Sequence, residues 1–493
     1  MLPTAFALGL AYLVVRTVYR LYFHPLSHIP GPKIAAVSHL YELYHDAIRG
    51  GMYIWEVEKM HKKYGPVVRI NPREVHIKDP HFYDEVYAPA SRKREKDGAF
   101  VGVFGFPLSM IATVGHEHHR IRRSLLNAFF SKKQVQALAG SVLAEQENKL
   151  IARLTEAHNE GRTVRLDDAY AALTADTISQ YSWGRSSGFL DDPSFKNDIR
   201  AALDEISQYV HIARFFPIMT TITRALPRPI LRWLRPAATA VLDMQDMVTQ
   251  SSEEKQVVGS RGTVFDALRD PSVSPEERSK ARIEEEGLIL VVAGTETTAR
   301  TLTIASYHLF GNRPLLLRLR EELCTIMPRP DTEVTWSQLE QLPLLNGVVN
   351  ESIRLSFGPI FRSTRVAPTE SLVYKKTVIP PKTPISMSTY FVHMDEEIFP
   401  EPASFKPERW IESQGQHLTK FITAFGKGSR NCLGMNLAYA ELYLTLAAMI
   451  RRFEIELVDA GPHSIRIERE MGIGQPIKGD FIVQAKIKKI ITE

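Results

Sequence analysis

The residues with the clearest chemical pattern surround Cys432, one of two cysteines in the chain. The run FGKGSRNCLG over 425–434 gives it a phenylalanine, three glycines and an arginine as neighbours, a combination with a chance probability on the order of one in a million. The apolar run Leu433–Phe453 predicts a helix beginning beside the sulfur, where the dipole favours an anion. The pattern therefore indicates a thiolate ligand. Cys324, in a helical stretch, fits the alternative of an inert buried thiol.

The run 425–434 resembles the haem-binding loop of the cytochrome P-450 family, the haem-thiolate monooxygenases. The resemblance implies that Cys432 is the axial ligand of the iron of haem b, where a thiolate favours O–O cleavage. It assigns Arg430 to a haem propionate, for which a fixed cation is suited. It also places against the haem a phenylalanine and glycines that let the backbone approach the ring, namely Phe425, Gly426, Gly428 and Gly434.

A second pattern lies in the middle of the helical stretch Arg282–Phe310, where the run AGTETT occupies 293–298. Glycine and threonine are poor helix formers, each costing up to about 1 kcal/mol relative to alanine, so their clustering in a helix needs a reason. One reason is hydrogen bonding of threonine hydroxyls to carbonyls one turn earlier, with no catalysis. The run also resembles the oxygen-activation helix of the monooxygenases. That resemblance implies a groove for O2 at Gly294 and proton delivery through water by Thr297 and Glu296.

Glu351 and Arg354 stand three residues apart on one face of a predicted helix, a pairing common on helix surfaces. Arg409 follows in the run FKPERW over 405–410, some twenty residues before the cysteine loop. In the family, residues at these positions form a buried triad that supports the cysteine loop. Their expected role is structural, because loss of one partner leaves a buried charge uncompensated at a cost of roughly 3–5 kcal/mol.

A histidine-rich basic segment, HEHHRIRR, occupies 116–123. His116, His118 and His119 share no helical face and have no carboxylate partner, so a metal site is disfavoured. The family has a Trp-x-x-x-Arg pair here that contacts the haem propionates. Counting back from Phe130 places Arg123 at the arginine position, and His119 replaces the tryptophan.

A further propionate arginine is expected in the run FRSTRV over 361–366. The resemblance assigns this position to Arg365, although its neighbour Arg362 could be confused with it.

The N-terminus is apolar from Leu2 to Val15, too short to span a bilayer unless the helix continues to Phe23. The basic residues all follow this segment, and three prolines lie in the next stretch. We expect a single-pass anchor over 1–23, a proline-rich hinge over 24–33 and a catalytic domain over 34–493. The positive-inside rule then places that domain in the cytosol, on the endoplasmic reticulum membrane. A cleaved signal peptide is the alternative, but no cleavage site or basic leader supports it.

The 493 residues contain no internal linker or repeat after residue 33, which favours one large unit. Two cysteines exclude a disulfide framework, and a net charge of +5 gives no case for nucleic acid. Short strand patterns at Val67–Ile77 and Val378–Ile385 predict a hairpin and a strand-turn-strand. The expected fold is mainly α with small β-sheets (α+β), as in cytochromes P-450.

Apolar segments predict the walls of a substrate pocket. These segments are Phe100–Ile111, 209–234, Leu288–Ala293, Pro359–Ser363 and Met471–Pro476. The segment 209–234 is broken by proline, so it either packs inside the fold or forms an entrance roof dipping into lipid, the reading the resemblance favours.

The function that the resemblance implies is a microsomal monooxygenase using O2, NADPH–cytochrome P-450 reductase and an apolar substrate. The runs 44–56 and 69–77 resemble trichodiene oxygenases of filamentous fungi, which implies a terpenoid; a polyketide or alkaloid stays open. The alternatives are a reductase-independent isomerase or dehydratase, which the Glu296–Thr297 pair disfavours, and a haem sensor or carrier. Four cations could form a basic face for the reductase: Arg120, Arg122, Lys406 and Lys427.

Overall fold

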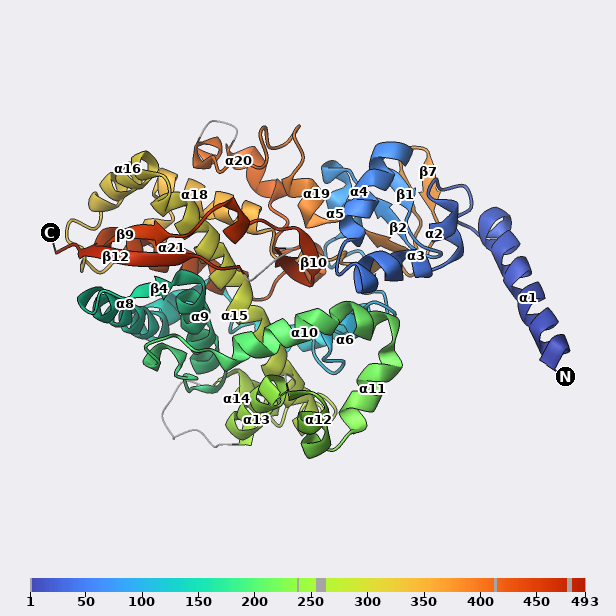
Figure 1. The fold of residues 1–493 in the computed structure, drawn as a ribbon, viewed down its shortest axis with the longest axis horizontal. Coiled ribbons are helices and arrows are strands. Elements are labelled where there is room, and N and C mark those ends of the chain that lie inside the picture. The colour runs from blue at the N-terminus through green and yellow to red at the C-terminus, as the bar shows by residue number, and fades with distance from the viewer. Residues whose placement is uncertain (1, 237–238, 254–262, 412–414, 477–480, 493) are drawn as a thin grey trace.

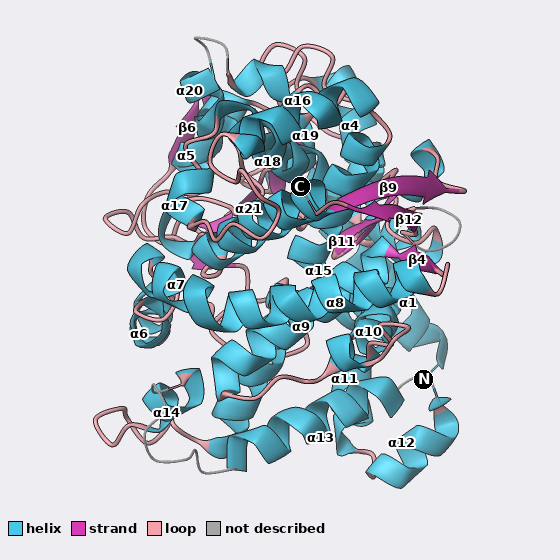
Figure 2. Ribbon diagram, turned by 90° about the vertical axis from the view of Figure 1, so that its left-hand side faces the viewer, coloured by secondary structure: helices cyan, strands magenta, loops and turns pink. Residues whose placement is uncertain are grey.

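The computed structural model describes residues 2–236, 239–253, 263–411, 415–476 and 481–492. Helices dominate, and four small sheets lie among them (Figures 1 and 2). The prediction of a mainly α fold with small sheets is confirmed.

The α-helices of the described residues have the following bounds: α1 (Leu2–Val18), α2 (Lys33–Val37), α3 (Leu40–Leu43), α4 (Tyr53–Tyr64), α5 (Tyr83–Val86), α6 (His116–Asn127), α7 (Lys132–Leu138), α8 (Ala144–Asn159), α9 (Leu166–Trp183), α10 (Asp198–Phe215), α11 (Pro217–Ala225), α12 (Arg228–Leu234), α13 (Thr239–Glu253), α14 (Val264–Arg269), α15 (Lys280–Phe310), α16 (Arg313–Cys324), α17 (Trp336–Leu339), α18 (Pro343–Ser356), α19 (Thr389–His393), α20 (Gly415–Leu418) and α21 (Met435–Arg452). The strands are β1 (Val67–Arg69), β2 (Val75–Ile77), β3 (Glu95–Lys96), β4 (Thr163–Arg165), β5 (Arg365–Val366), β6 (Leu372–Tyr374), β7 (Thr377–Ile379), β8 (Pro384–Ser386), β9 (Phe453–Val458), β10 (Arg469–Met471), β11 (Ile473–Gln475) and β12 (Gln484–Ile490).

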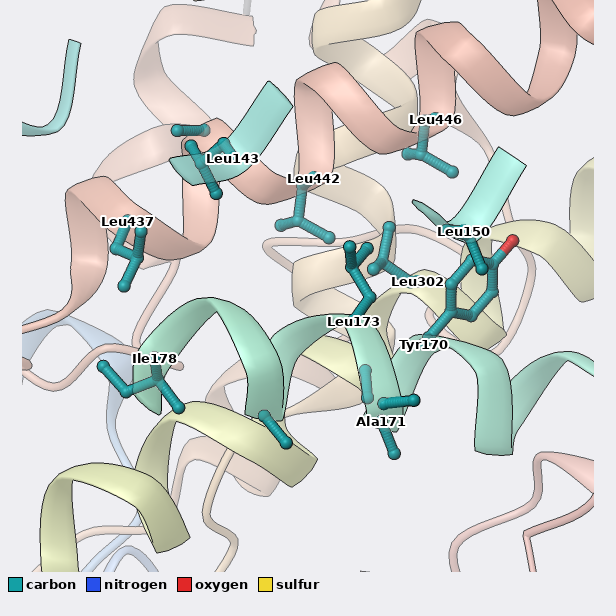
Figure 3. Close-up of a cluster of buried hydrophobic side chains, with 14 of the residues drawn as sticks. Leu143, Leu150, Tyr170, Ala171, Leu173, Ile178, Leu302, Leu437, Leu442 and Leu446 are labelled. Carbon is teal, nitrogen blue, oxygen red and sulfur yellow. The ribbon is translucent and has the colours of Figure 1, made fainter. Parts of the chain in front are cut away.

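The long helix α15 runs through the middle of the molecule and is buried on most sides (Figure 1). Its main partner is α9, a helix whose apolar and small side chains are buried all round, as expected for a central helix. Side chains of α9, α15 and α21 meet in one apolar cluster (Figure 3). Two polar contacts fix α9 against α15: Tyr170 and Ser306 share a hydrogen bond of 2.7 Å, and the Thr174 hydroxyl donates to the Thr295 carbonyl at 2.8 Å.

The largest sheet has the order β1-β2-β8-β5-β3 and carries residues that reach the candidate site. Strands β1 and β2 pair antiparallel, which confirms the hairpin predicted at Val67–Ile77. The strands predicted within Val378–Ile385 exist as β7 and β8, but they do not pair with each other. Strand β7 pairs with β6, whereas β8 joins the large sheet between β2 and β5.

Helix α1 extends away from the body of the protein (Figure 1), whereas the π-helical turn after it, Tyr19–Phe23, contacts the body: the Arg69 guanidinium donates to the Arg20 carbonyl at 2.8 Å. The span Pro3–Phe23 has 21 residues, a mean hydropathy of 1.3 and no buried part, so it is long and apolar enough to cross a membrane. Helix α15 also meets this criterion but is mostly buried in the core. The connector 24–33 is fixed to the body, since Leu26 and Ile29 are buried and the Arg69 N–H donates to the Pro30 carbonyl at 2.8 Å.

The segment 209–234 forms the end of α10 together with α11 and α12. Its apolar side chains are largely exposed, with Ile218 at 62% and Trp233 at 79%. The exposure excludes the interpretation that this segment packs inside the fold.

Candidate active site

The loop before α21 places Cys432 at the edge of a deep cavity that lies between this loop and α15. The Cys432 N–H donates to the Phe425 carbonyl at 2.7 Å, which closes the loop on itself. The Cys432 side chain is exposed at the cavity, where desolvation by the surrounding protein raises the pKa of its thiol; this effect is opposed by the Gly434 N–H and by Arg123. The sulfur thus lies beside the N-terminus of α21, as the sequence predicts, and Phe425, Gly426 and Gly434 line the same cavity.

A glycine is needed at position 428 for a different structural reason than at the other loop glycines. It has a φ of +69°, and a Cβ there would lie 2.1 Å from the Ala88 carbonyl oxygen. It does not line the cavity with its neighbours, so its approach to the haem stays a prediction. It is required by the close passage of the segment at 87–88.

One end of the cavity is lined by five basic side chains: Lys96, His119, Arg123, Arg365 and Arg430. They come from β3, α6, β5 and the cysteine loop. Their hydrogen bonds go to neutral groups: Arg430 donates to the Thr113 and Val114 carbonyls at 2.6 Å each, and Arg123 donates to the Asn431 carbonyl at 2.6 Å. Among the described residues, no carboxylate forms an ion pair with any of them.

This concentration of buried positive charge has electrostatic consequences. Burial and the neighbouring cations, Arg430 first, lower the pKa of His119 to about 2, so its imidazole is neutral. Burial and Arg365 lower the pKa of Arg430 to about 9, and burial puts the pKa of Lys96 well below its usual value. Buried cations need counter-charges, so this end of the cavity is suited to a ligand that carries carboxylates.

Lys96 is a residue that the sequence analysis missed. It is buried and donates to the Ile111 carbonyl, and its ammonium lies over the Phe104 ring at 4.4 Å. The only local signal is its place in the basic run KREK over 93–96, which resembles an ordinary solvated surface.

The opposite wall of the cavity is one face of α15, which contains Gly294 and Thr297. The Thr297 hydroxyl donates to the Ala293 carbonyl at 2.8 Å, and Thr295 and Thr301 bond backward in the same way. The back-bonding alternative therefore holds, and Thr297 also faces the cavity. A Cβ on Gly294 would lie 2.8 Å from the Ile178 side chain, so this glycine also permits the close packing of α9.

Glu296 lies on a different side of α15 from Thr297, because adjacent helical residues are about 100° apart. It forms ion pairs with Arg300 at 3.2 Å and Arg200 at 3.5 Å. It lines a second, polar cavity with Arg165 and Asp168, and it does not line the cavity of Cys432. The structure thus places the predicted site residues along one cavity, with the exceptions of Gly428 and Glu296.

The predicted triad is assembled beneath the cysteine loop. The Arg354 guanidinium donates to both Glu351 oxygens at 2.8 and 2.9 Å, and Arg409 donates to Glu351 at 3.2 Å. His393 connects this group to the loop: its Nδ1 donates to the Arg354 carbonyl at 2.8 Å, and its Nε2 accepts the Thr423 N–H at 2.9 Å. No sequence motif marks His393, which acquires this role through the packing of α19.

Two nearby basic residues, His118 and Arg362, bind carboxylates outside the site. His118 pairs with Glu277 at 2.6 Å, away from His119, so the three histidines do not converge on one point. Arg362 forms ion pairs with Glu42 and Glu74 and does not line the cavity, whereas Arg365 does line it.

Two expectations about exposure are corrected. Arg122 is buried against Glu277 at 2.8 Å, so it cannot belong to an exposed basic face. Cys324 lies on the exposed side of α16 instead of being buried.

The apolar walls of the cavity come from three of the five predicted segments. The lining residues in them are Phe104, Met110, Ile111, Ile289, Leu290, Ala293, Pro359, Phe361 and Ser363. Within the described part of the chain, the segments 209–234 and 471–476 contribute no lining residue, so that part of the prediction is wrong. The exposed position of α11 and α12 explains the first of these errors.

A thiolate loop on a braced support, a cluster of unpaired cations and a threonine-containing central helix are the parts of a haem-thiolate site. The family model described as Cytochrome P450 matches residues 30–483. The chain belongs to the cytochrome P450 family.

Curated relatives cover almost the whole of this cytochrome P450. It is 44% identical to cytochrome P450 monooxygenase aflU of Aspergillus parasiticus over 480 residues, 96% of each chain. It is 43% identical to cytochrome P450 monooxygenase TRI4 of Trichoderma arundinaceum, over 96% of this chain and 93% of that one. It is 42% identical to conidiogenone synthase PchP450 of Penicillium rubens, over 96% of each.

This cytochrome P450 is therefore a monooxygenase of the haem-thiolate class, whose cofactor is iron protoporphyrin IX. The residues present fit that cofactor. Cys432 would supply the sulfur ligand, and Lys96, Arg123, Arg365 and Arg430, which have no carboxylate partner in the described chain, would offer counter-charges for two propionates.

Proposed function

We propose that this cytochrome P450 is a microsomal monooxygenase that inserts one oxygen atom from O2 into an apolar terpenoid of fungal secondary metabolism. Electrons come from NADPH through a separate cytochrome P-450 reductase. The observation that carries the proposal is the single cavity that holds Cys432, the unpaired cations and Thr297 against an apolar wall.

Haem bound there supplies an iron centre for the activation of O2. Cys432 donates electron density from its sulfur, and Arg123, Arg365, Arg430 and Lys96 hold the propionates. The Thr297 hydroxyl supports proton delivery at the face of α15. Glu296 would pass protons through water from the polar cavity on the outer side of this helix toward Thr297; Arg200 and Arg300 hold its carboxylate there.

A terpenoid substrate is supported by the cavity wall and by the relatives. Phe104, Met110, Ile289, Leu290 and Phe361 present an apolar surface to the same cavity. Two of the relatives carry the names TRI4 and conidiogenone synthase, and the runs 44–56 and 69–77 resemble trichodiene oxygenases. A sesquiterpene similar to trichodiene is the first substrate to test.

The membrane is the proposed location, with α1 as a single-pass anchor in the endoplasmic reticulum and the catalytic body in the cytosol. The exposed apolar side chains of α11 and α12, Ile218, Met219, Ile222 and Trp233 among them, form a second surface for lipid contact. Exposed cations on the cysteine-loop side, Arg120 and Lys406, remain available to an acidic reductase, although each has a nearby carboxylate partner.

The test is co-expression with cytochrome P-450 reductase in microsomes, fed separately with terpene, polyketide and indole precursors, with products identified by mass spectrometry. The proposal predicts an oxygenated terpene that requires NADPH and reductase. Oxygenation of a polyketide with terpenes untouched would contradict the substrate. Product formation without NADPH would support the isomerase alternative, and bound haem that never turns over would support a sensor.

A further inference from the structure

The cavity face of α15 has a polar group at each end and apolar groups between them. Glu286, Ile289, Leu290, Ala293 and Thr297 all line the cavity. Thr297 follows Glu286 by eleven positions, about three helical turns, which returns both to the same face with a rise of roughly 16 Å. The wall thus has a hydroxyl where the chemistry is proposed and a carboxylate far from it.

The Glu286 carboxyl is held in place by one of its oxygens. Oε2 accepts the Met110 N–H at 2.9 Å and lies 2.6 Å from Nη1 of Arg282. Glu286 is only 1% exposed, yet Oε1 has no hydrogen-bond partner among the described residues. A buried carboxylate oxygen normally accepts hydrogen bonds, so the free oxygen at the cavity is available to a donor on a ligand.

A purely structural role for Glu286 would be to brace the segment around Met110 against α15. The neighbouring Glu285 already makes such a brace, since its Oε2 accepts the Leu108 N–H at 2.6 Å. Glu285 does not line the cavity, whereas Glu286 does. The two residues therefore share the bracing role, and Glu286 alone presents an oxygen to the cavity.

We propose that Glu286 is a binding subsite for a hydroxyl group on an otherwise apolar substrate. The hydroxyl lies at the end of the substrate remote from the carbon that is oxidised, on the order of 10–16 Å away along the α15 face. This inference rests on the proposed function and refines its substrate class to a terpenoid alcohol. The reaction that supplies this substrate is then an oxygenation, or a hydrolysis that releases an alcohol.

The test uses the haem-loaded full chain and two probes, farnesol and the hydrocarbon that lacks only its hydroxyl. Binding is followed by the spectral shift of the haem, which requires neither reductase nor turnover. A hydrogen bond to a charged group corresponds to roughly tenfold or more in affinity, so farnesol should bind about tenfold more tightly than the hydrocarbon. In Glu286→Leu the two probes should bind with equal affinity.

Two further variants separate recognition from bracing. Glu286→Gln keeps an acceptor for Met110 and removes the charge, so the farnesol preference should fall to a few-fold. Glu285→Gln, the matched control, should keep the full preference. Equal affinity of wild type for both probes, or a preference that survives in Glu286→Leu, would overturn the inference. The inference would also be overturned if Glu286→Leu and Glu286→Gln weakened the binding of both probes equally, because that result indicates that Glu286 only braces the fold.

The proposed function is checked separately in the same preparations. A thiolate-type carbon monoxide spectrum and reductase-dependent NADPH oxidation test the monooxygenase, whereas the ratio of the two dissociation constants tests Glu286. If Glu286→Leu does not fold, the ratio in Glu286→Gln decides.

Discussion

Lys96 illustrates how single residues acquire a role in this site through burial and surrounding charge. Its ammonium is in the cavity among three arginines without any carboxylate partner in the described chain. Cys432, Arg123, Arg365 and Arg430 could be predicted because they stand in local motifs. Lys96 and His393 could not, because their neighbours in space are distant in sequence.

The first prediction concerns Lys96→Met, which removes a counter-charge for a haem propionate. We expect haem to dissociate roughly ten times faster, since a hydrogen bond to a charged group is worth about 1.5–3 kcal/mol. Transfer of haem to an excess of apomyoglobin measures this rate. Lys93→Met is the matched control, because Lys93 is exposed beside Glu117, and it should leave the rate unchanged. Equal rates in all three proteins would contradict the role of Lys96.

Among the elements, helix α15 carries its candidate catalytic side chains on two different faces. Thr297 faces the cavity of Cys432, and Glu296 faces the outer polar cavity. The sequence placed both residues in one helix but could not show that the carboxylate is held by Arg200, which comes from α10. Long-range partners of this kind leave no signal in a local motif.

The second prediction is that Thr297→Ala lowers product formed per NADPH consumed. General acid–base support is worth about 10²–10⁴ in rate, so turnover should fall by at least a hundredfold while substrate affinity stays similar. Thr303→Ala is the control, because Thr303 makes the same backward hydrogen bond, to Ala299, without lining the cavity. Similar losses in both variants would indicate a helix defect in place of a proton-delivery defect.

The support beneath the cysteine loop predicts a dependence on pH. Burial lowers the pKa of His393 to about 3, so it is neutral in the folded protein. The unfolded chain, with a histidine pKa near 6.5, binds more protons between these values, and stability is therefore lost as the pH falls below about 6.5. The thiolate-type carbon monoxide spectrum should decay with acidification over this range.

His393→Asn tests this assignment, because asparagine keeps a donor and an acceptor but does not titrate. The variant should lose less stability than wild type between pH 6.5 and pH 4, with a difference of up to about 1.4 kcal/mol per pH unit. Urea unfolding followed by the haem absorbance measures the difference. Identical pH profiles would contradict the role of His393.

At the scale of the whole molecule, one helical body carries the cavity, and α1 lies outside it (Figure 1). The fold class and the first hairpin were predictable from hydrophobic pattern and resemblance. The assignment of β7 and β8 to two different sheets was not predictable, because strand partners depend on contacts distant in sequence. The same applies to the cavity walls, where α11 and α12 proved to be surface elements.

The fourth prediction concerns deletion of residues 1–23, which leaves the packed connector in place. We expect a folded, haem-binding protein with weaker affinity for lipid vesicles, because α1 is exposed; the deletion also removes the Arg20 carbonyl, which accepts a hydrogen bond from Arg69. Replacing Ile218 and Trp233 by aspartate in the truncated chain should abolish the remaining vesicle binding. Vesicle flotation measures both effects. Loss of the haem spectrum on truncation would contradict this account of α1.

Cys432 is the proposed sulfur ligand of the haem iron. The most direct measurement is the ferrous carbon monoxide difference spectrum of full-length wild type and Cys432→Ser, with Cys324→Ser as the control. We expect a thiolate-type spectrum for wild type and Cys324→Ser, and loss of this spectrum together with turnover in Cys432→Ser. A Cys432→Ser protein that keeps both the thiolate-type spectrum and turnover would contradict it.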